Sequence, residues 1–185
     1  MFEYVKVMFG TTSGAKSDFE YKINEVNESN NWNPNAKNGR DFGGFNYATE
    51  DCILRWLHRG DTIYDVEVPK NAENIKLDGA TTIYRTNKII IKNPRKVTDE
   101  MAMEFYKKSN IPEKSYYKAL GAVALMNYKN TALAILRDKV NKNNIDIVLE
   151  EWNDFIKNGG DGNRLNTNET IRLIDESLND IKSCK

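Results

Sequence analysis

A chain of 185 residues is long enough to bury a core without disulfide bonds or metals, and it fits one domain or one with a small second one. Its 27 basic residues balance 27 acidic residues, which disfavours a broad electrostatic surface for nucleic acid or anionic membrane. No stretch approaches the roughly 18 apolar residues that span a bilayer. We therefore expect no membrane partner, and nucleic acid is the least favoured partner.

The cysteines and the single histidine restrict the chemistry further. Cys52 and Cys184 lie far apart in the chain and match no metal-ligand spacing, which favours a reducing cytoplasm over a disulfide framework. One histidine and two cysteines are also too few for a typical zinc site of nitrogen and sulfur ligands. The sequence therefore predicts a cytoplasmic protein without a metal site, and metal binding by aspartate and glutamate oxygens is an open alternative that no motif supports.

The first part of the chain begins with strand and loop signals. Residues 2–9, "FEYVKVMF", lack the basic and long apolar segments of a secretion signal and predict a strand that carries Phe2, Tyr4, Val7 and Phe9. Residues 18–26 predict a short helix, and residues 27–44 have the composition of a long surface loop. Trp32 in this loop either anchors it by burial or, if exposed, contacts a ligand or partner.

Residues 43–69 predict a helix between two strands. Thr49 suits the N-cap, and the acidic Glu50 follows in the first turn, where the helix dipole favours negative charge. Gly60 suits the left-handed position that ends the helix. The apolar face falls on Ile53, Trp56 and Leu57. The strand that follows places Tyr64, Val66 and Val68 on one face.

Capping also accounts for the ionisable residues at the end of this helix. His58 and Arg59 lie in the last turn, where cations suit the dipole, and Asp61 begins the turn into the next strand. We favour this structural interpretation over a reactive site for these three residues. Tyr47 and Glu50 are less fully explained by capping, so they remain the candidates for chemistry.

Further strands and then helices complete the chain. Residues 73–77 and 81–94 predict strands, with "KIIIK" typical of a strand buried on both faces. Helices are predicted at residues 98–108, 112–128, 130–140, 144–158 and 169–182; Pro112 takes a first helical position, and Asn166 with Glu169 forms a capping box. The predicted fold class is α+β: an N-terminal mixed or antiparallel sheet with a short helix, residues 1–97, and a C-terminal helical bundle, residues 98–185.

Familiar nucleotide and nucleophile motifs are absent from the sequence. "GTTSGAKS" lacks the Gly-Lys-Ser ending of a P-loop, and neither GxGxxG nor Gly-x-Ser-x-Gly occurs. A triad of Ser13, His58 and Asp61 stays open, but no spacing favours it.

The order of "VMFGTTSG", "GGFNYATEDCILRWL", "GDTIYDVEVP" and "TNKIIIKNP" resembles the ADP-ribosyltransferase fold over the first half of the chain. The resemblance implies that Gly10 and Thr11 fall on the family's first NAD-contacting motif, and Tyr47 with Thr49 on its second. The chain departs from the family at two places. Phe9, or Lys6 in a shifted register, holds the position of the family's histidine or arginine, and Asn87 and Lys88 stand where a catalytic glutamate is common.

The function that this resemblance implies is an NAD-binding ADP-ribosyltransferase-like protein, intact or degenerate. Such chemistry needs an aromatic stacking surface, donors for the diphosphate and an anion near the ribose. Tyr47 is the expected stacking residue, and Glu50 is the expected catalytic carboxylate. Thr11 and Thr12, with Thr49 and Arg85, are the remaining expected NAD contacts, with Arg85 on a phosphate.

The alternative is a non-catalytic phage or mobile-element protein that binds and inhibits a host (defence) protein. The chain also resembles uncharacterised phage and bacterial domains with a Gly-aromatic segment followed by a "VEVP" strand, and these imply no activity. Tyrosines on the helices, Tyr116, Tyr117 and Tyr128, are candidates for such an interface. The basic stretch at residues 85–96 is the only signal for nucleic acid.

Overall fold

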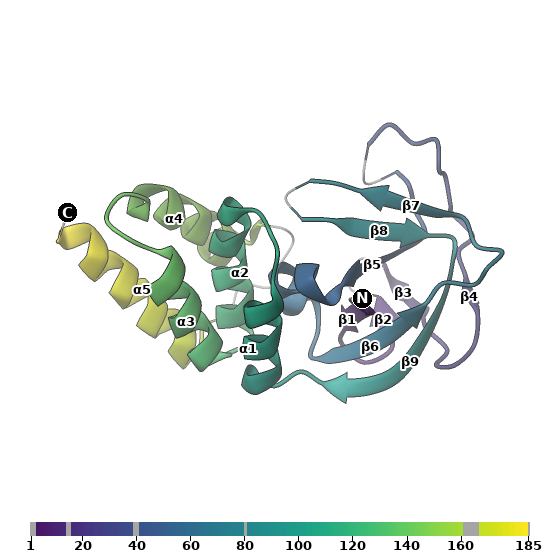
Figure 1. Ribbon diagram of the computed structural model, residues 1–185, viewed down its shortest axis with the longest axis horizontal. Helices are drawn as coiled ribbons and strands as arrows, with labels where there is room; N and C mark the ends of the chain where they lie inside the picture. Colours follow the sequence, from purple (N-terminus) through teal and green to yellow (C-terminus); the bar gives the residue numbers. More distant parts are fainter. Residues whose placement is uncertain (1–2, 14–15, 39–40, 80, 161–166, 185) are drawn as a thin grey trace.

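The computed structural model describes residues 3–13, 16–38, 41–79, 81–160 and 167–184, with a strand-rich half beside a helical half (Figure 1). Within these residues the predicted α+β class is confirmed, because an antiparallel seven-stranded sheet precedes the helices. The spatial order of the sheet is β4-β9-β6-β1-β5-β8-β7. The predicted division between residues 97 and 98 falls between the last strand and the first helix, and it stays a prediction.

The strands of the sheet are β1 (Tyr4–Met8), β4 (Asn27–Glu28), β5 (Phe45–Thr49), β6 (Thr62–Glu67), β7 (Asn74–Leu77), β8 (Ile83–Thr86) and β9 (Lys88–Lys96); β2 (Thr12–Ser13) and β3 (Lys16–Glu20) form a separate hairpin. The helices are α1 (Asp99–Lys108), α2 (Glu113–Leu125), α3 (Lys129–Lys139), α4 (Ile145–Trp152) and α5 (Glu169–Ser183), and a π-helical turn, η3 (Asn153–Lys157), extends α4.

The central strand β1 is buried on both faces. Val5 and Val7 join the large hydrophobic cluster that continues into the helices, whereas Met8 joins a second cluster on the opposite face of the sheet. Tyr4 and Phe9, which were expected to share the strand's apolar pattern, are 38% and 43% exposed at its two ends. Phe2 lies outside the described residues.

The helix predicted at residues 18–26 is wrong. Its first residues belong to β3, and the chain then continues irregularly to β4. Phe19, Tyr21 and Ile23 occupy every second position and all pack onto the second hydrophobic cluster. A period of two places side chains on one face of an extended chain, so tertiary packing favours the extended form here.

The segment after β5 also differs from the predicted α-helix. Two short 3₁₀ helices, η1 (Glu50–Cys52) and η2 (Leu54–Arg59), replace it, and the Thr49 side chain makes no capping hydrogen bond. Gly60 is extended, with φ at 175°, so it is not a left-handed cap. A glycine is required there for another reason: a Cβ atom would lie 2.0 Å from the backbone carbon of Met8.

The η2 helix joins the sheet to the helical half, as Figure 1 shows, by packing against both β1 and α2. Leu54 and Leu57 are completely buried in the large cluster, which also contains Val5 of β1 and Leu120 of α2. Burial of each leucine contributes on the order of 2 kcal/mol. The sheet and the helices therefore share one hydrophobic cluster.

Some helices of the helical half are capped by the residue that precedes them, and one is capped by a residue of another helix. Thr98 caps α1 as predicted, accepting a hydrogen bond from the Met101 amide, whereas Pro112 is the N-cap of α2 and not its first helical residue. Asn168, and not the predicted Asn166, caps α5 by accepting from the Ile171 amide; Asn166 lies outside the described residues. Thr98 and Asn168 each satisfy an amide that has no partner within its helix, whereas Pro112 makes no such hydrogen bond.

Asp99 caps a helix other than its own. Its carboxylate accepts hydrogen bonds from the backbone amides of Asn130 and Thr131, at 2.8 and 3.0 Å, in the first turn of α3. The Thr131 hydroxyl donates a further bond of 2.7 Å to the same carboxylate. An anion at this position also interacts favourably with the α3 dipole.

We predict that Asp99→Ala lowers the free energy of unfolding by about 2 kcal/mol, because three donors at the start of α3 lose a charged acceptor. Urea denaturation followed by circular dichroism measures the change. Glu100→Ala is the matched control, since Glu100 is an exposed carboxylate in the same first turn of α1. Equal losses in the two variants would contradict the capping role of Asp99.

Candidate functional site

The sheet separates two of the predicted NAD contacts. Tyr47 pairs across strands with Tyr84, and its neighbour Asn46 pairs with Arg85. Successive residues of a strand point to opposite faces, so Tyr47 and Arg85 lie on opposite faces of the sheet. Tyr47 belongs to the second hydrophobic cluster, and Arg85 lies on the face that η2 and the helices cover.

Tyr47 has its ring surfaces in contact with other tyrosines. Its ring stacks on Tyr84 with centroids 5.3 Å apart and planes 19° apart, and the Tyr4 ring meets it edge-on at 5.1 Å. The Tyr47 hydroxyl donates to Asn74 Oδ1 at 2.8 Å, and burial raises the pKa of this hydroxyl above its usual value. We call Tyr4, Tyr47 and Tyr84 the tyrosine cluster.

Glu50 and Thr49 lie at the end of β5 that leads into η1. The Glu50 carboxylate pairs with Lys108 at the end of α1, with 3.2 Å between oxygen and nitrogen. Thr49 lies opposite Tyr4 in the β1–β5 pairing, on the same side of the sheet as the tyrosine cluster. Glu50 is therefore engaged with the helical half while Thr49 borders the tyrosines.

Thr11 and Thr12 lie in a third place, around the turn that leads from β1 into β2. The Thr11 hydroxyl donates to Glu20 at 3.3 Å, and the Thr12 hydroxyl donates to the Phe9 carbonyl at 3.2 Å. The structure thus brings Tyr47 and Thr49 together and leaves Glu50, the two threonines and Arg85 apart. In this arrangement the six residues do not form one NAD site, and NAD binding stays a prediction.

His58 is buried between η2 and the helices. Its Nδ1 lies 3.2 Å from the carbonyl oxygen of Arg55, and its ring meets Phe155 edge-on at 4.9 Å. A carbonyl only accepts, so Nδ1 carries the proton of this hydrogen bond. The Arg55 guanidinium lies over the Trp56 ring at 4.6 Å. These contacts support a structural role for His58, within a 3₁₀ helix that the sequence pattern did not reveal.

Lys6 and Arg85, two basic residues of the sheet, form no ion pair with a carboxylate among the described residues. Lys6 is buried, and its ammonium donates to the Asn46 carbonyl at 2.7 Å and lies 5.3 Å from the centre of the Tyr21 ring. Arg85 donates from Nη1 to the Gly43 carbonyl at 3.0 Å. Burial, with the nearby positive charge of Arg85, lowers the pKa of Lys6 to about 8.

The second edge of Arg85 has unmet hydrogen-bonding capacity. Its Nε is shielded from solvent and has no partner, and the same holds for the Oδ1 atom of Asn46, its cross-strand neighbour. Burial lowers the pKa of the Arg85 guanidinium. We call Asn46 and Arg85 the Arg85 cluster. The Lys6 side chain lies on the other face of the sheet, beside Tyr21. Sequence analysis identified Arg85 but had no signal for Asn46.

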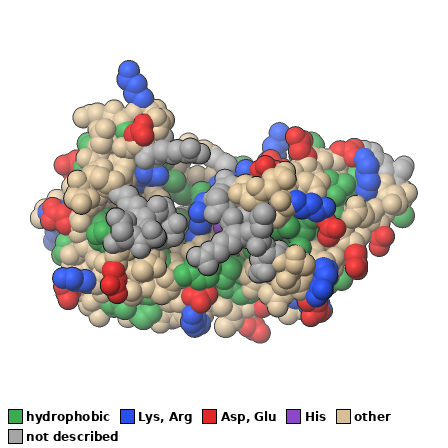
Figure 2. Space-filling view, turned by 180° about the vertical axis from the view of Figure 1, so that it is seen from behind, with side chains coloured by type: hydrophobic (Ala, Val, Ile, Leu, Met, Phe, Trp, Pro, Cys, Tyr) green, Lys and Arg blue, Asp and Glu red, His purple; other side chains and the backbone are tan. Residues whose placement is uncertain are grey.

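One face of the molecule is hollowed between its two halves. Figure 2 shows basic side chains and part of the histidine within this hollow. Trp56 of η2 and Thr81, just before β8, are connected by a hydrogen bond of 3.0 Å from Nε1 to Oγ1.

The basic stretch at residues 85–96 is largely neutralised by its neighbour strand. Lys92 pairs with Glu67 at 2.5 Å, Arg95 pairs with Asp65, and Lys96 pairs with Asp61 at 2.6 Å. The Lys96 ammonium holds the pKa of Asp61 below its usual range. This pairing leaves little free positive charge on β9 to attract phosphate backbones.

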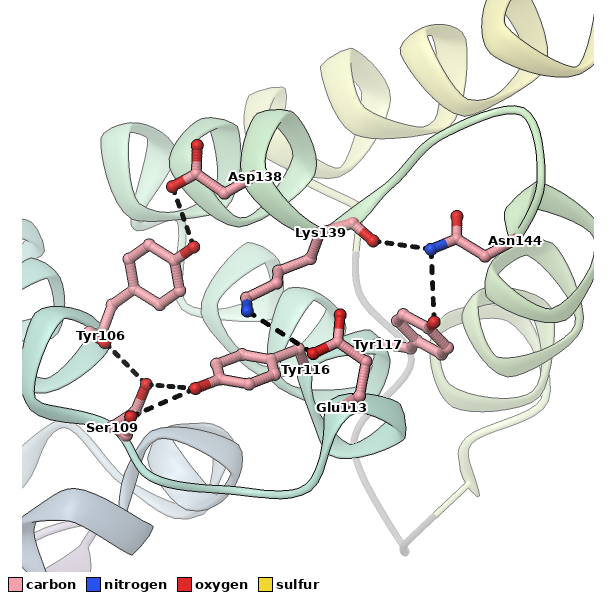
Figure 3. A network of polar contacts seen from close by, with 8 residues as sticks. All are labelled: Tyr106, Ser109, Glu113, Tyr116, Tyr117, Asp138, Lys139 and Asn144. Carbon is pink, nitrogen blue, oxygen red and sulfur yellow. Dashed lines mark hydrogen bonds and ion pairs between the residues drawn. The ribbon is translucent and has the colours of Figure 1, made fainter.

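The helical tyrosines proposed as interface residues are buried, which corrects that expectation. Figure 3 shows the hydroxyls of two of them in a polar network: Tyr116 with Ser109 at 2.9 Å and Tyr117 with Asn144 at 3.3 Å. Tyr128 donates to the Val97 carbonyl at 3.2 Å. Buried tyrosines usually bond their hydroxyls in this way. They stabilise contacts within the helical half and its junction with β9.

Two further observations concern metal ions and membranes. Across the described ranges, no three histidine, cysteine, aspartate or glutamate side chains gather in a way that could hold a metal ion. In the same part of the chain, every helix is too short or too polar to cross a membrane.

No protein-family model, curated protein or solved structure matches this chain.

The buried Lys6 makes stability depend on pH. The pKa of its side chain is 10.5 without the protein environment and about 8 in the folded chain. Between these values the unfolded chain binds the extra proton, so this group makes the folded state more stable as pH rises. We predict that the stability difference between Lys6→Met and the natural chain changes by about 3 kcal/mol from pH 7 to above pH 10.

Urea denaturation at a series of pH values measures this difference, and subtraction removes contributions from the tyrosines. Lys22→Met is the control, because the Lys22 side chain is 73% exposed beside Glu25. The stability difference between Lys22→Met and the natural chain should stay constant from pH 7 to above pH 10. A flat difference for Lys6→Met would contradict the lowered pKa.

Proposed function

We propose that this chain is a non-catalytic binding protein that recognises a partner protein through the tyrosine cluster. The observation that carries the proposal is the exposure of Tyr4, which is 38%, on top of two further tyrosines. Tyrosine is enriched among residues that dominate protein interfaces, because its ring buries a large area while its hydroxyl bonds at the rim.

The tyrosine cluster is ordered by contacts between its rings and by a hydrogen bond from Tyr47. Tyr4 meets the rings of Tyr47 and Tyr84 at 5.1 and 5.3 Å, and Tyr47 is fixed by its bond to Asn74. A side chain that is already ordered loses less conformational entropy when a partner binds. The tyrosines are therefore organised for contact before the partner arrives.

The border of the cluster is polar and close to neutral. Lys76, which lies opposite Tyr84 on β7, pairs with Asp78 at 3.1 Å. Thr49 contributes a hydroxyl on the other side, opposite Tyr4. An apolar centre with a polar rim is the usual anatomy of a protein interface. A partner recognised here needs no strong net charge of its own.

The ADP-ribosyltransferase-like alternative has less support from this arrangement. Its stacking residue Tyr47 is covered by other rings, and its carboxylate Glu50 is paired with Lys108. The expected phosphate contact Arg85 lies on the other face of the sheet. The partner class that the sequence predicts, a host protein bound by a phage or mobile-element factor, is the one to test first.

We predict that Tyr4→Ser weakens binding of the partner at least tenfold, because it removes the most exposed ring of the cluster and leaves only the buried Tyr47 and the partly buried Tyr84. Affinity purification from a bacterial host lysate with immobilised protein, followed by binding measurements on the recovered partner, tests this. Ile147→Ser is the matched control: Ile147 is 44% exposed on α4 and belongs to the helical half. Equal binding by both variants would refute recognition through the tyrosine cluster.

A separate experiment addresses NAD. We expect no release of nicotinamide when the protein is incubated with NAD, because Tyr47 offers no open ring face and Glu50 is held in an ion pair. Chromatography of the products and titration calorimetry measure turnover and binding. Nicotinamide release that is lost in Glu50→Gln would establish the transferase alternative and overturn the non-catalytic proposal.

A further inference from the structure

The two edges of the seven-stranded sheet differ in how they are protected. At one edge, β4 pairs with the start of β9, and a bridge between Ile23 and Ile91 extends this cover. β9 also contains Pro94, which has no N–H to offer to a further strand, and its pairing with β6 is irregular. Features of this kind prevent an edge from pairing with another chain.

The opposite edge, β7, is open. β7 pairs with β8 in a regular register and contains no proline, and its residues Asn74 and Lys76 are exposed. Among the described residues, none outside β8 forms a backbone hydrogen bond with β7. The charge of Lys76, which is a common protection of edges, is offset by Asp78 at 3.1 Å. This edge is therefore available to another chain.

The hydrogen-bond pattern identifies the backbone groups of β7 that point outward. The Asn87 amide donates to the Glu73 carbonyl at 3.2 Å, so the residues that precede the β7–β8 pairing are bonded to each other. Residues of an antiparallel strand alternate between bonding inward and outward. Ile75 therefore bonds to β8, whereas Asn74 and Lys76 direct their N–H and C=O groups away from the sheet. The backbone of another extended chain is complementary to these groups.

The side chains at this edge indicate what such a chain carries. Ile75, Leu77 and Ile83 lie on the same face of the sheet, are half-buried, and belong to neither hydrophobic cluster of the described residues. A strand paired with β7 places every second side chain beside this face. Apolar residues at those positions remove the exposed parts of the three side chains from water. Polar residues suit the intervening positions, which lie on the side of Lys76.

The open edge adjoins the tyrosine cluster. Lys76 lies opposite Tyr84, and Asn74 Oδ1 accepts the hydrogen bond of the Tyr47 hydroxyl. β8 and β5 separate β7 from β1, which carries Tyr4. Neighbouring strands are about 4.8 Å apart, so β7 lies about 14 Å from β1. A protein interface of ordinary size, about 800 Å² on each partner, covers both.

We infer that the partner protein presents an extended segment that adds a strand to β7, with apolar residues at every second position beside Ile75 and Leu77. This inference rests on the function proposed above, because it names the element by which the same partner is recognised. Hydrogen bonds between the backbones supply affinity in this binding mode, and the alternating side chains supply specificity.

Lys76→Pro tests the inference, and the probe is the partner recovered by the affinity purification described above. Proline removes the outward N–H of this position and takes no hydrogen bond from the β7–β8 pairing, so the sheet stays intact. We expect titration calorimetry to show binding weakened about tenfold or more. Lys76→Gln is the matched control, because it removes the same charge and keeps the N–H. Its affinity should stay within about twofold, since an exposed ion pair contributes little.

Hydrogen exchange followed by NMR examines the same edge without a substitution. In the free chain, the amide protons of Asn74 and Lys76 should exchange rapidly, whereas that of Ile75 is protected by its bond to β8. Binding of the partner should slow exchange at Asn74 and Lys76 about tenfold or more. This measurement tests the added strand even if Lys76→Pro lowers the stability of the chain.

The outcomes separate this inference from the proposed function. The added strand is refuted if Tyr4→Ser weakens binding while Lys76→Pro binds as the natural chain does, or if the amides of Asn74 and Lys76 stay unprotected in the complex; recognition through the tyrosine cluster then stands. Equal weakening by Lys76→Gln and Lys76→Pro also refutes it, because the lysine side chain then accounts for the effect. If the lysate yields no partner that depends on Tyr4, the proposed function fails and this inference fails with it.

Discussion

The alternation of side chains across one antiparallel sheet is the constraint on which the functional geometry depends. β5 and β8 are paired so that Tyr47 faces Tyr84 and Asn46 faces Arg85. Adjacent positions point to opposite faces, and both faces are covered, one by η2 with the helices and the other by the segment around Tyr21. A one-residue change of register would exchange the two sets of side chains. The register therefore decides which residues can act together.

This separation gives the molecule two surfaces with different chemistry. The tyrosine cluster is aromatic, partly exposed and bordered by a paired lysine and aspartate, which suits contact with another protein. The Arg85 cluster is basic and half-buried, and its Arg85 Nε and Asn46 Oδ1 atoms are shielded from solvent and have no hydrogen-bond partner. The tyrosine ring and the Asn46 amide point away from each other, because different faces of β5 supply them.

The junction between the halves is apolar and specific. η2 places Leu54 and Leu57 in the cluster shared by β1 and α2, while Gly60 passes so close to Met8 that no larger residue fits without a shift. Asp99 and Asn127 connect helices by accepting hydrogen bonds from the first turns of α3 and α5. These contacts join segments that are distant in sequence, so local patterns do not reveal them.

Much of the fold was predictable from local patterns. The period-two pattern of β6 and the run around Ile91 predicted strands, and Thr98 with its following acids predicted the start of α1. These elements follow local rules because their own periodicity and capping residues agree with their final environment. Residues 18–26 and the segment after Thr49 did not follow such rules, since packing against the sheet overrode their local preferences.

The candidate sites were likewise predictable only in part from the sequence. Sequence by itself singled out Tyr47 and Arg85 as chemically notable, because ring and guanidinium groups can be recognised without coordinates. It had no means to show that Tyr4 and Tyr84 cover Tyr47, or that Asn46 accompanies Arg85. Only the tertiary structure decided those neighbours, because strand pairing and register depend on contacts between residues far apart in the chain.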